Sequence, residues 1–328
     1  MGRRLAPRLI VLGIAVVIAL LGFVPLPFYL LAPGSAVDLR DAVSVDNAAP
    51  PPTHFYLTDV ALARTTALTA AFALLPGYKL VKSEAIVPTG IPEKVYERTM
   101  VAAMTESQSI AAAVGERAAG YRVPAPSERL IVERGVGKSA RAAFEAGDEI
   151  REVDGRPAAS LDALHARVHA LRAGSAVTVA VRRHGSLKHV RVITEQGKSG
   201  TQLGIFLAEQ AGPIHLPRHV RFDIGDVGGS SGGLMFALDV FATLRPRHVA
   251  AMKVAGTGTI AFDGRVGEIA GTMQKIIAAK RAGATIFLCP QQNYRDVSGV
   301  SGVRVIPVHT FREALDAIGE RSKTASAQ

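Results

Sequence analysis

The chain has 328 residues, enough for about two domains of ~100–200 residues besides a terminal segment, and its 48% hydrophobic content can supply sizeable cores. Its formal net charge of +10 is dispersed, with no Lys/Arg block interleaved with aromatic residues, which argues against a nucleic-acid partner. The single cysteine, Cys289, excludes an intramolecular disulfide, and no Cys/His cluster or His-Glu-x-x-His run indicates a metal site.

The N-terminal segment has the pattern of a membrane anchor. Arg3, Arg4 and Arg8 precede an uncharged, mostly apolar run over residues 9–32. A bilayer-spanning helix needs ~20 apolar residues, and positive charge before it favours a cytoplasmic N-terminus. We therefore expect a single-pass protein of the cell membrane with its body outside the cytoplasm. A cleaved signal peptide, with a cleavage site at residues 34–36, is the alternative.

The next segment, up to residue 126, combines a linker, a strand and helices. Three prolines exclude a helix or a central strand over residues 47–53. A strand is expected at 54–62, a helix at 65–75, and a longer helix at 93–119 that ends before Gly120.

Residues 127–194 have a pattern of their own. An alternating strand at 130–136 is followed by a short strand between the turn dipeptides Gly147–Asp148 and Asp154–Gly155, then by a helix at 161–171 and a hairpin around His184–Gly185. In this order of elements the segment resembles a PDZ domain. The resemblance implies binding of an extended peptide beside an edge strand, with its C-terminal carboxylate on backbone N–H groups. The Gly-Leu-Gly-Phe-like loop that usually holds the carboxylate has no clean copy near residues 130–140.

From residue 202 onward the sequence is glycine-rich, with short apolar strands alternating with helices. Strands are expected at 203–209, 220–225, 284–290 and 302–308 and on both sides of Asp263–Gly264, and helices at 234–244, 272–282 and 311–318. This alternation predicts an α/β or α+β domain.

The run GDVGGSSGGLMFALDVF, residues 225–241, places a flexible loop directly before a strongly predicted helix. A phosphate-binding loop would need a lysine that this run lacks. A flexible turn without function is a second interpretation. In the third, a serine nucleophile at the start of a helix gains the helix dipole and free N–H groups for an oxyanion.

A serine nucleophile needs a base. The nine histidines are scattered and none lies in a recognisable catalytic context. Lys275 is the other candidate, because on its predicted helix it lies opposite Ile276 and Ile277, on an alanine-lined face that invites close packing. Desolvation would lower the pKa of this lysine toward neutrality. A solvated surface lysine beside Lys280 and Arg281 is the alternative.

Three motifs in this region resemble, in the same order, the proteolytic domain of Lon proteases. They are GGSSGGLMFAL, GTGTIAFDGRVGEI and IAGTMQKIIAAKRAG, which begin at residues 228, 256 and 269. That family uses a Ser-Lys dyad, and the motifs place Ser231 at the serine and Lys275 at the lysine. The proline and alanine beside the family serine are replaced here by Ser230 and Gly232. Ser230 is the alternative nucleophile.

The resemblance also implies supporting roles. Backbone N–H groups at Ser231 and Gly229 would stabilise the oxyanion, with Ser230 and Gly232 shaping the loop, and Thr257 or Thr259 would hydrogen-bond the lysine. Neutral Lys275 would take the proton of Ser231, which attacks a peptide carbonyl to form an acyl-enzyme.

Taken together, the chain resembles the membrane-anchored, PDZ-containing Lon-like proteases of bacteria. The expected α+β architecture has a cytoplasmic tip and transmembrane helix at 1–36, an extracytoplasmic segment packing on the protease at 37–126, a PDZ-like β-rich domain at 127–197, a Lon-type α/β proteolytic domain at 198–320 and a tail at 321–328. The PDZ-like domain would receive substrate or partner tails.

The expected activity is that of a serine endopeptidase acting on protein or peptide substrates. No Walker A sequence is present, so we expect it to work without ATP and without a cofactor. A hexameric homo-oligomer is implied by analogy with Lon-like domains. Two alternatives remain: a catalytically inactive PDZ adaptor at the membrane, and a nucleotide-binding module, which would need the lysine that the glycine loop lacks.

Overall fold

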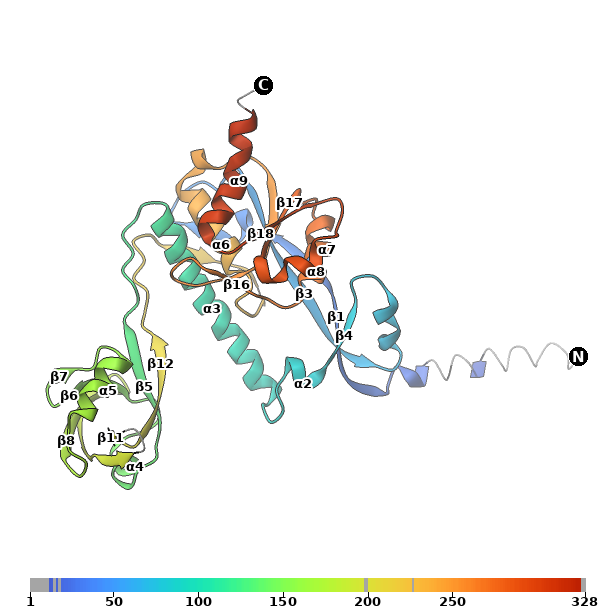
Figure 1. Ribbon diagram of the computed structural model, residues 1–328. Helices are drawn as coiled ribbons and strands as arrows, with labels where there is room; N and C mark the ends of the chain where they lie inside the picture. Colours follow the sequence, from blue (N-terminus) through green and yellow to red (C-terminus); the bar gives the residue numbers. More distant parts are fainter. Residues whose placement is uncertain (1–11, 14–15, 17–18, 198–199, 226, 326–328) are drawn as a thin grey trace, which may run out of the picture. The chain divides into compact units, whose positions relative to one another are not determined.

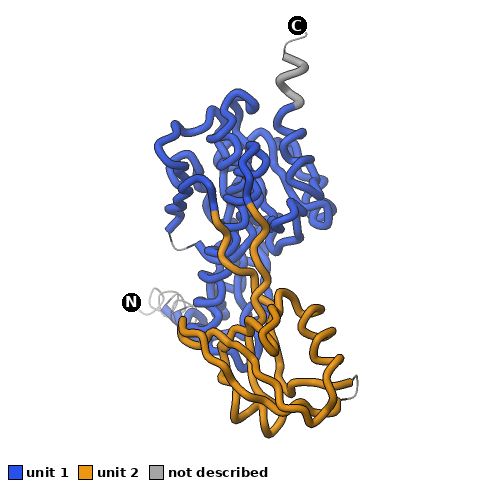
Figure 2. Tube along the Cα trace, turned by 90° about the vertical axis from the view of Figure 1, so that its left-hand side faces the viewer, with its two compact units in different colours: residues 1–123, 216–328 blue, residues 124–215 orange. Residues whose placement is uncertain are grey.

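The computed structural model describes residues 12–13, 16, 19–197, 200–225 and 227–325 of the chain. They form two compact units, shown in different colours in Figure 2. Unit 1 combines residues 1–123 with residues 216–328, and unit 2 consists of residues 124–215. The first unit is therefore built from two stretches of chain separated by the second.

The expected N-terminal transmembrane helix is wrong. No helix within the described ranges has the length and the apolar character needed to cross a bilayer. The last third of the run expected to form the anchor belongs to strand β1 (Pro25–Asp38), which pairs antiparallel with β3 (His54–Thr66) and β4 (Lys79–Lys82). Pro25 and Pro27 disfavour a helix here, and a high average hydropathy does not distinguish a buried strand from a span.

This finding also corrects the expected location. The single-pass placement in the cell membrane depended on the same helix, and the α+β assignment therefore stands here without its transmembrane element. Residues 1–11, 14–15 and 17–18 of the expected anchor lie outside the described residues.

The described part of unit 1 is organised around a six-stranded sheet with the order β18-β17-β14-β3-β1-β4 (Figure 1). Strands β14 (Lys253–Gly256), β17 (Ile286–Pro290) and β18 (Arg304–Val308) run parallel to one another, and β14 also runs parallel to β3. All five residues of β17 are buried, as expected for a central strand covered on both faces. The N-terminal stretch thus supplies half of this sheet.

Helices cover both faces of the sheet. Val254, Ile286 and Leu288 share a core with helix α6 (Gly233–Leu244), whereas their strand neighbours Phe287 and Cys289 share one with helix α7 (Thr272–Arg281). Successive strand residues point to opposite faces, so the two helices lie on opposite sides.

Helix α3 (Glu93–Ala118) packs against α6, where Gly115 lies so close that a Cβ on it would meet the carbonyl oxygen of Ala237 at 2.7 Å. Helix α6 is buried around almost its whole circumference because it is enclosed between α3 and the sheet, and its buried residues are apolar except for Asp239 and Thr243. Helix α9 (Phe311–Ala325) follows β18.

The shorter elements of unit 1 are η2 (Leu39–Asp41), β2 (Val43–Val45), η3 (Thr69–Leu74), α2 (Ser83–Ile86), β13 (Val220–Phe222), η4 (Pro246–His248), β15 (Thr259–Ile260), β16 (Val266–Gly267), η5 (Gln291–Asn293) and α8 (Tyr294–Val297). The helix expected at 65–75 is reduced to η3, because strand β3 continues to Thr66.

Unit 2 is a sheet with the order β12-β5-β6-β8-β9 and two helices. Its elements are β5 (Glu128–Gly135), α4 (Lys138–Ala143), β6 (Glu149–Val153), β7 (Arg156–Pro157), α5 (Leu161–His169), β8 (Ala176–Arg183), β9 (Ser186–Ile193), β10 (Glu195–Gly197), β11 (Gly200–Gln202) and β12 (Ile205–Ala211). Val132, Ile150, Leu164 and Val179 form part of its core. Residues 200–215, expected to belong to the following domain, lie in unit 2, since β12 pairs antiparallel with β5.

Candidate active site

The glycine-rich loop before α6 presents Ser231 to a cavity, and its glycines are needed for two different reasons. Gly229 has a φ of 88°, a conformation that residues with a side chain rarely adopt. Gly233 is enclosed, since a Cβ on it would lie 2.8 Å from Ile260 Cγ2 and 2.8 Å from Ser107 Oγ. The loop can therefore turn sharply and let helix α6 start deep in the core.

Hydrogen bonds from two sides hold the loop in place. Its Gly229 N–H donates to the carbonyl oxygen of Met100 at 2.9 Å, and the Ser107 hydroxyl donates to the carbonyl oxygen of Ser230 at 3.1 Å. The carbonyl oxygen of Ser231 accepts from the Gly258 N–H at 2.8 Å and from the Thr257 hydroxyl at 3.0 Å. The backbone of the serine is thus fixed between helix α3 and the segment that follows β14.

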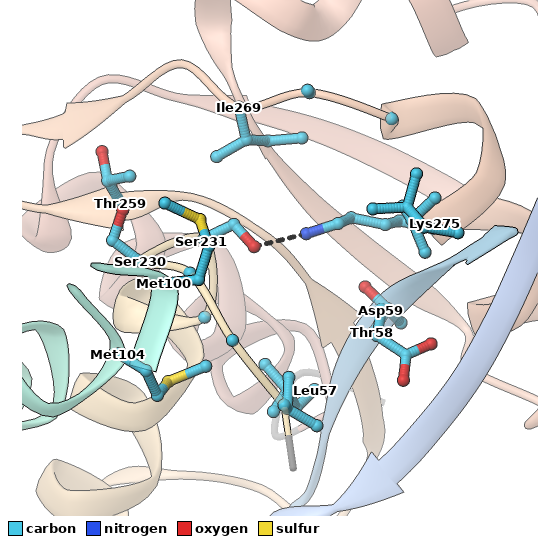
Figure 3. A pocket seen from close by; sticks show the side chains of 18 of the residues that line it. Leu57, Thr58, Asp59, Met100, Met104, Ser230, Ser231, Thr259, Ile269 and Lys275 are labelled. Carbon is cyan, nitrogen blue, oxygen red and sulfur yellow. Dashed lines mark hydrogen bonds between the residues drawn. The ribbon is translucent and has the colours of Figure 1, made fainter. Parts of the chain in front are cut away.

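Ser231 and Lys275 meet inside unit 1. The Nζ atom of Lys275 lies 2.6 Å from Ser231 Oγ and 3.1 Å from Thr257 Oγ1. In Figure 3 the dashed line joins the first two groups, which point toward each other from α7 and from the glycine loop. At 2.6 Å a proton can pass directly between hydroxyl and amine.

Burial changes the chemistry of the amine. Lys275 is only 4% exposed, because α7 packs on β1 and β3. Loss of hydration lowers the pKa of Lys275 to about 8, while the negative charge of Asp59 acts in the opposite direction. A neutral amine has a free lone pair and accepts the hydrogen bond that the Ser231 hydroxyl donates. Lys275 is therefore a competent base near neutral pH.

The alanine-lined face of α7 explains this burial. Ala278 is 2% and Ala279 0% exposed, so the sheet approaches the helix closely on the side that carries the lysine. Ile276, expected on the opposite, apolar side, is also buried at 0%. Lys275 is thus held in the interior by a helix face of small side chains.

A cavity of about 520 Å³ opens beside the two groups. One part of its wall is apolar and is formed by Leu31, Leu57, Leu62, Ile86, Met100 and Met104. Its charged lining residues are Asp59, Glu268 and Lys275, and the glycine loop 228–232 forms another wall. The cavity has the size and the mostly apolar lining of a small-ligand or peptide side-chain site.

The residues expected to support the dyad have different surroundings. Thr257 contacts Lys275, whereas Thr259 lines the cavity. The Gly229 N–H donates to the carbonyl oxygen of Met100, so it is not available to an oxyanion in the cavity. The N–H groups of Ser230, Ser231 and Gly232 make no hydrogen bond within the described part of the chain. Ser230 contributes its backbone carbonyl to the contact with Ser107.

Several residues of the site were not anticipated from the sequence. Met100, Met104 and Ser107 belong to α3, and Leu57 and Asp59 belong to β3. They lie more than 100 positions before Ser231, and their pattern indicated only an ordinary helix and strand. No local signal connected them with the glycine loop, because only the fold brings them there.

Unit 2 also contains a feature that was missed. The tetrapeptide LGIF, residues 203–206, resembles a Gly-Leu-Gly-Phe-like loop and leads directly into β12, the edge strand of the sheet. It follows the helices and strands of the expected PDZ-like segment instead of preceding them. The motif was present in the sequence, but it lay beyond the end expected for the PDZ-like domain.

Comparison with known proteins yields two family matches. Residues 206–318 match the model of the Lon protease (S16) C-terminal proteolytic domain, and residues 127–194 match that of the PDZ domain. These matches support a Lon-type serine peptidase domain and a PDZ domain in this chain.

Curated relatives agree with the first match. Lon protease 2 of Bacillus subtilis (strain 168) is 34% identical over 102 residues, which cover 30% of this chain and 18% of that protein. Lon protease 2 of Herpetosiphon aurantiacus is 39% identical over 104 residues, which cover 30% of this chain and 13% of that protein. The chain thus spans less than a fifth of the length of either relative.

Among solved structures, the PDZ domain of the SdrC-like protein from Listeria monocytogenes is 21% identical. The match covers 27% of this chain and 94% of the Listeria chain, with a TM-score of 0.24. The PDZ assignment rests on the family match alone.

Proposed function

We propose that unit 1 is an endopeptidase that hydrolyses peptide bonds of protein or peptide substrates through Ser231 and Lys275, without ATP. The observation that carries the proposal is the 2.6 Å contact between Ser231 Oγ and the Nζ atom of a 4% exposed lysine. ATP independence is included because the 328 residues contain no Walker A sequence.

The geometry allows a complete proton cycle. Neutral Lys275 accepts the hydroxyl proton while Ser231 Oγ bonds to the substrate carbonyl carbon, and the carbonyl oxygen becomes an oxyanion. The ammonium then gives the proton to the departing amine as the C–N bond breaks, which leaves an acyl-enzyme. Water hydrolyses the ester with Lys275 again as the base, and Ser231 recovers its proton.

The loop supplies the electrostatic part of this scheme. The uncommitted N–H groups at Ser230, Ser231 and Gly232 precede helix α6, whose N-terminal dipole favours negative charge. The Thr257 hydroxyl accepts a hydrogen bond from Nζ at 3.1 Å and donates one to the Ser231 carbonyl oxygen at 3.0 Å. One side chain therefore positions both members of the dyad.

Cleavage of a casein substrate by Ser231→Ala tests the proposal. The variant removes one oxygen atom, so it should remain folded and lose essentially all hydrolysis, as expected for loss of a nucleophile. Ser301→Ala, an exposed serine in a loop away from the cavity, is the matched control and should cleave like the unaltered protein. Unchanged cleavage by Ser231→Ala would overturn the assignment and favour Ser230 as the nucleophile, whereas no cleavage by the unaltered protein would favour an inactive adaptor.

A second function is supported by unit 2. Strand β12 is an edge of its sheet, and Gly204, just before it, has a φ of 70°. The N–H groups of Leu203 and Gly204 have no hydrogen-bond partner among the described residues. We propose that an extended peptide adds to β12 with its C-terminal carboxylate on these N–H groups. A substrate or partner tail could be held there.

The test is fluorescence anisotropy of the full-length Ser231→Ala protein with labelled hexapeptides that end in valine, leucine, phenylalanine or alanine. At least one peptide with a free C-terminus should bind, and its C-terminally amidated form should bind at least ~10-fold more weakly, because a neutral amide loses the charge-assisted hydrogen bonds. Equal binding of the two forms, or no binding by any peptide, would contradict the proposed mode.

A further inference from the structure

The cavity beside Ser231 contains a carboxylate that the hydrolytic cycle does not use. Asp59 lies on β3 among the cavity-lining residues, and Figure 3 places it below Lys275. Its two oxygens are held by one residue of β1, since Oδ1 accepts the Ser35 N–H and Oδ2 accepts the Ser35 hydroxyl at 2.8 Å. The carboxylate therefore has a fixed position, which is what a recognition group requires.

The backbone of β1 is adapted to this carboxylate. A Cβ on Gly34 would lie 1.7 Å from Asp59 Oδ1, so only glycine lets the strand approach so closely. The pairing of β1 with β3 is also irregular between Pro33 and Ala36. A glycine and a strand irregularity thus bring the Ser35 N–H onto Asp59, and the half-buried carboxylate is held by the neighbouring strand.

The charges that line the cavity do not balance once the lysine is neutral. Asp59, Glu268 and Lys275 are the charged lining residues, and neither carboxylate forms a salt bridge with any described residue. When Lys275 has lost its proton, as the reaction requires, two negative charges remain. A partly enclosed anionic cavity attracts a cationic side chain, and the lower effective dielectric strengthens the attraction.

The apolar wall suits the stem of such a side chain. Leu31 of β1 pairs with Leu62 of β3, the strand that carries Asp59, and both leucines line the cavity. Lysine and arginine carry three or four methylene groups that can cover apolar surface while the charged end reaches a carboxylate. An acidic side chain would meet Asp59 with like charge, and a neutral one would leave its charge uncompensated.

We propose that Asp59, assisted by the exposed Glu268, makes this cleft selective for peptide segments with a lysine or arginine within three residues of the scissile bond. This inference rests on the proposed peptidase function. Asp59 is a specificity-determining residue here and takes no part in bond breaking.

Pairing with a substrate cation has a second consequence. The negative charge of Asp59 favours the ammonium form of Lys275 and thus raises its pKa. A lysine or arginine that neutralises Asp59 removes this effect, so more of the enzyme holds the base in its reactive, neutral form. A basic substrate is therefore favoured both in binding and in activation of Ser231.

The experiment measures kcat/KM for internally quenched peptides of one parent sequence, in which each of the six positions around the scissile bond is in turn Lys, Gln or Glu. At one or more positions the unaltered protein should prefer Lys over Gln by about tenfold, and Gln over Glu. The amide oxygen of Asp59→Asn can still accept the Ser35 N–H. In this variant the kcat/KM values for the Lys and Gln peptides should differ by no more than about twofold. Glu268→Gln should lower it less, and Asp316→Asn, an exposed carboxylate on α9, should leave it unchanged.

A pH profile distinguishes charge recognition from a merely structural effect of the substitution. With the Gln peptide, the rising limb of kcat/KM should begin at lower pH in Asp59→Asn than in the unaltered protein. With the Lys peptide, the two proteins should have similar pH profiles of kcat, which reports the enzyme–substrate complex in which the substrate cation neutralises Asp59. A Gln-peptide profile unmoved by Asp59→Asn overturns the proposal, as does a Lys/Gln ratio near one at every position.

The outcome also separates this proposal from the peptidase assignment. If the Gln peptide is cleaved by the unaltered protein and not by Ser231→Ala, the peptidase stands whatever the charge preference is. If the ratio is insensitive both to Asp59→Asn and to an increase in salt, selectivity by Asp59 is excluded while the peptidase remains. If no peptide is cleaved by any protein, both proposals fail.

Discussion

At the scale of single residues, the surroundings of a side chain rather than its identity decide its chemistry here. Lys275 and Lys280 are on the same helix. Lys275 is 4% exposed and hydrogen-bonded to Ser231, whereas Lys280 is exposed. Cys289 shows the same dependence, because burial in β17 raises the pKa of its thiol to about 12 and makes it unreactive. Its apolar sequence context had already indicated a buried strand.

Burial of the lysine should cost stability in a defined pH range. In the folded protein the pKa of Lys275 is about 8, against an ordinary value of 10.5, so between these pH values the unfolded chain holds more protons than the folded one. The cost is full below about pH 8, declines as the pH rises, and is gone above about 10.5. The stability of the folded protein should accordingly rise over this interval.

Lys275→Met tests this cost. The variant keeps a long apolar stem and should raise the free energy of unfolding at pH 7 by on the order of a few kcal/mol while abolishing cleavage. Urea denaturation at pH 7 and pH 10.5 measures the effect, which should shrink at the higher pH. Lys280→Met is the control on the same helix and should change stability little. An equal gain for both variants would show that Lys275 is not the buried cation inferred here.

At the scale of elements, the start of α6 depends on close packing that only glycine allows. Gly233 is enclosed by Ile260 and Ser107, and the same region connects the nucleophile loop to α3. Ser231 lies two residues before Gly233, next to these contacts with α3 and β15.

Gly233→Ala should therefore destabilise unit 1 by about 1–3 kcal/mol, since an added methyl group has no space. The measurement is urea denaturation together with casein cleavage, and cleavage should fall because Ser231 is displaced. Gly299→Ala is the matched control, because a Cβ there meets nothing within 4 Å. A Gly233→Ala protein as stable and as active as Gly299→Ala would contradict the account of the loop.

Helices whose periodicity and ends are marked in their own sequence were predictable. Strands whose place depends on neighbouring strands were not. The helix expected at 93–119 is found at Glu93–Ala118, and the helix expected at 272–282 is found at Thr272–Arg281, because their periodicity and terminal glycines are local signals. Strand β1 was mistaken for part of a membrane helix, since an apolar run does not reveal whether β3 and β4 or lipid will cover it. The motif frame singled out Ser231 and Lys275, which lie in contact in the structure, whereas Met100 and Asp59 required the fold.

At the scale of the whole molecule, the site draws on both ends of unit 1. The match to the Lon proteolytic domain covers residues 206–318, yet β1, β3, β4 and α3 come from residues 1–123. These elements complete the sheet beside β14 and supply Leu57, Asp59 and Met100 to the cavity. Ser231 and Lys275 lie in the C-terminal part, but the chain before residue 124 forms much of the candidate site.

A chain shortened to residues 124–328 should therefore fail as a peptidase, although it retains Ser231, Lys275 and every residue of the family match. Without β1 and β3, α7 loses the surface that buries Lys275, and the glycine loop loses its bond to Met100. Casein cleavage and a thermal unfolding curve, compared with the full chain, measure the effect. Activity of the shortened chain near that of the full chain would show that the N-terminal elements are dispensable.

The central claim is that a buried, neutral lysine activates Ser231. Its most direct test is the pH dependence of kcat/KM for a neutral peptide, with peptide concentrations well below KM. Because Lys275 must lose its proton before it can act as the base, the rate should rise about tenfold per pH unit below a midpoint and level off above it, with the midpoint at about 8. A rate that is flat between pH 6 and 10, or that falls as the pH passes 8, would contradict the mechanism.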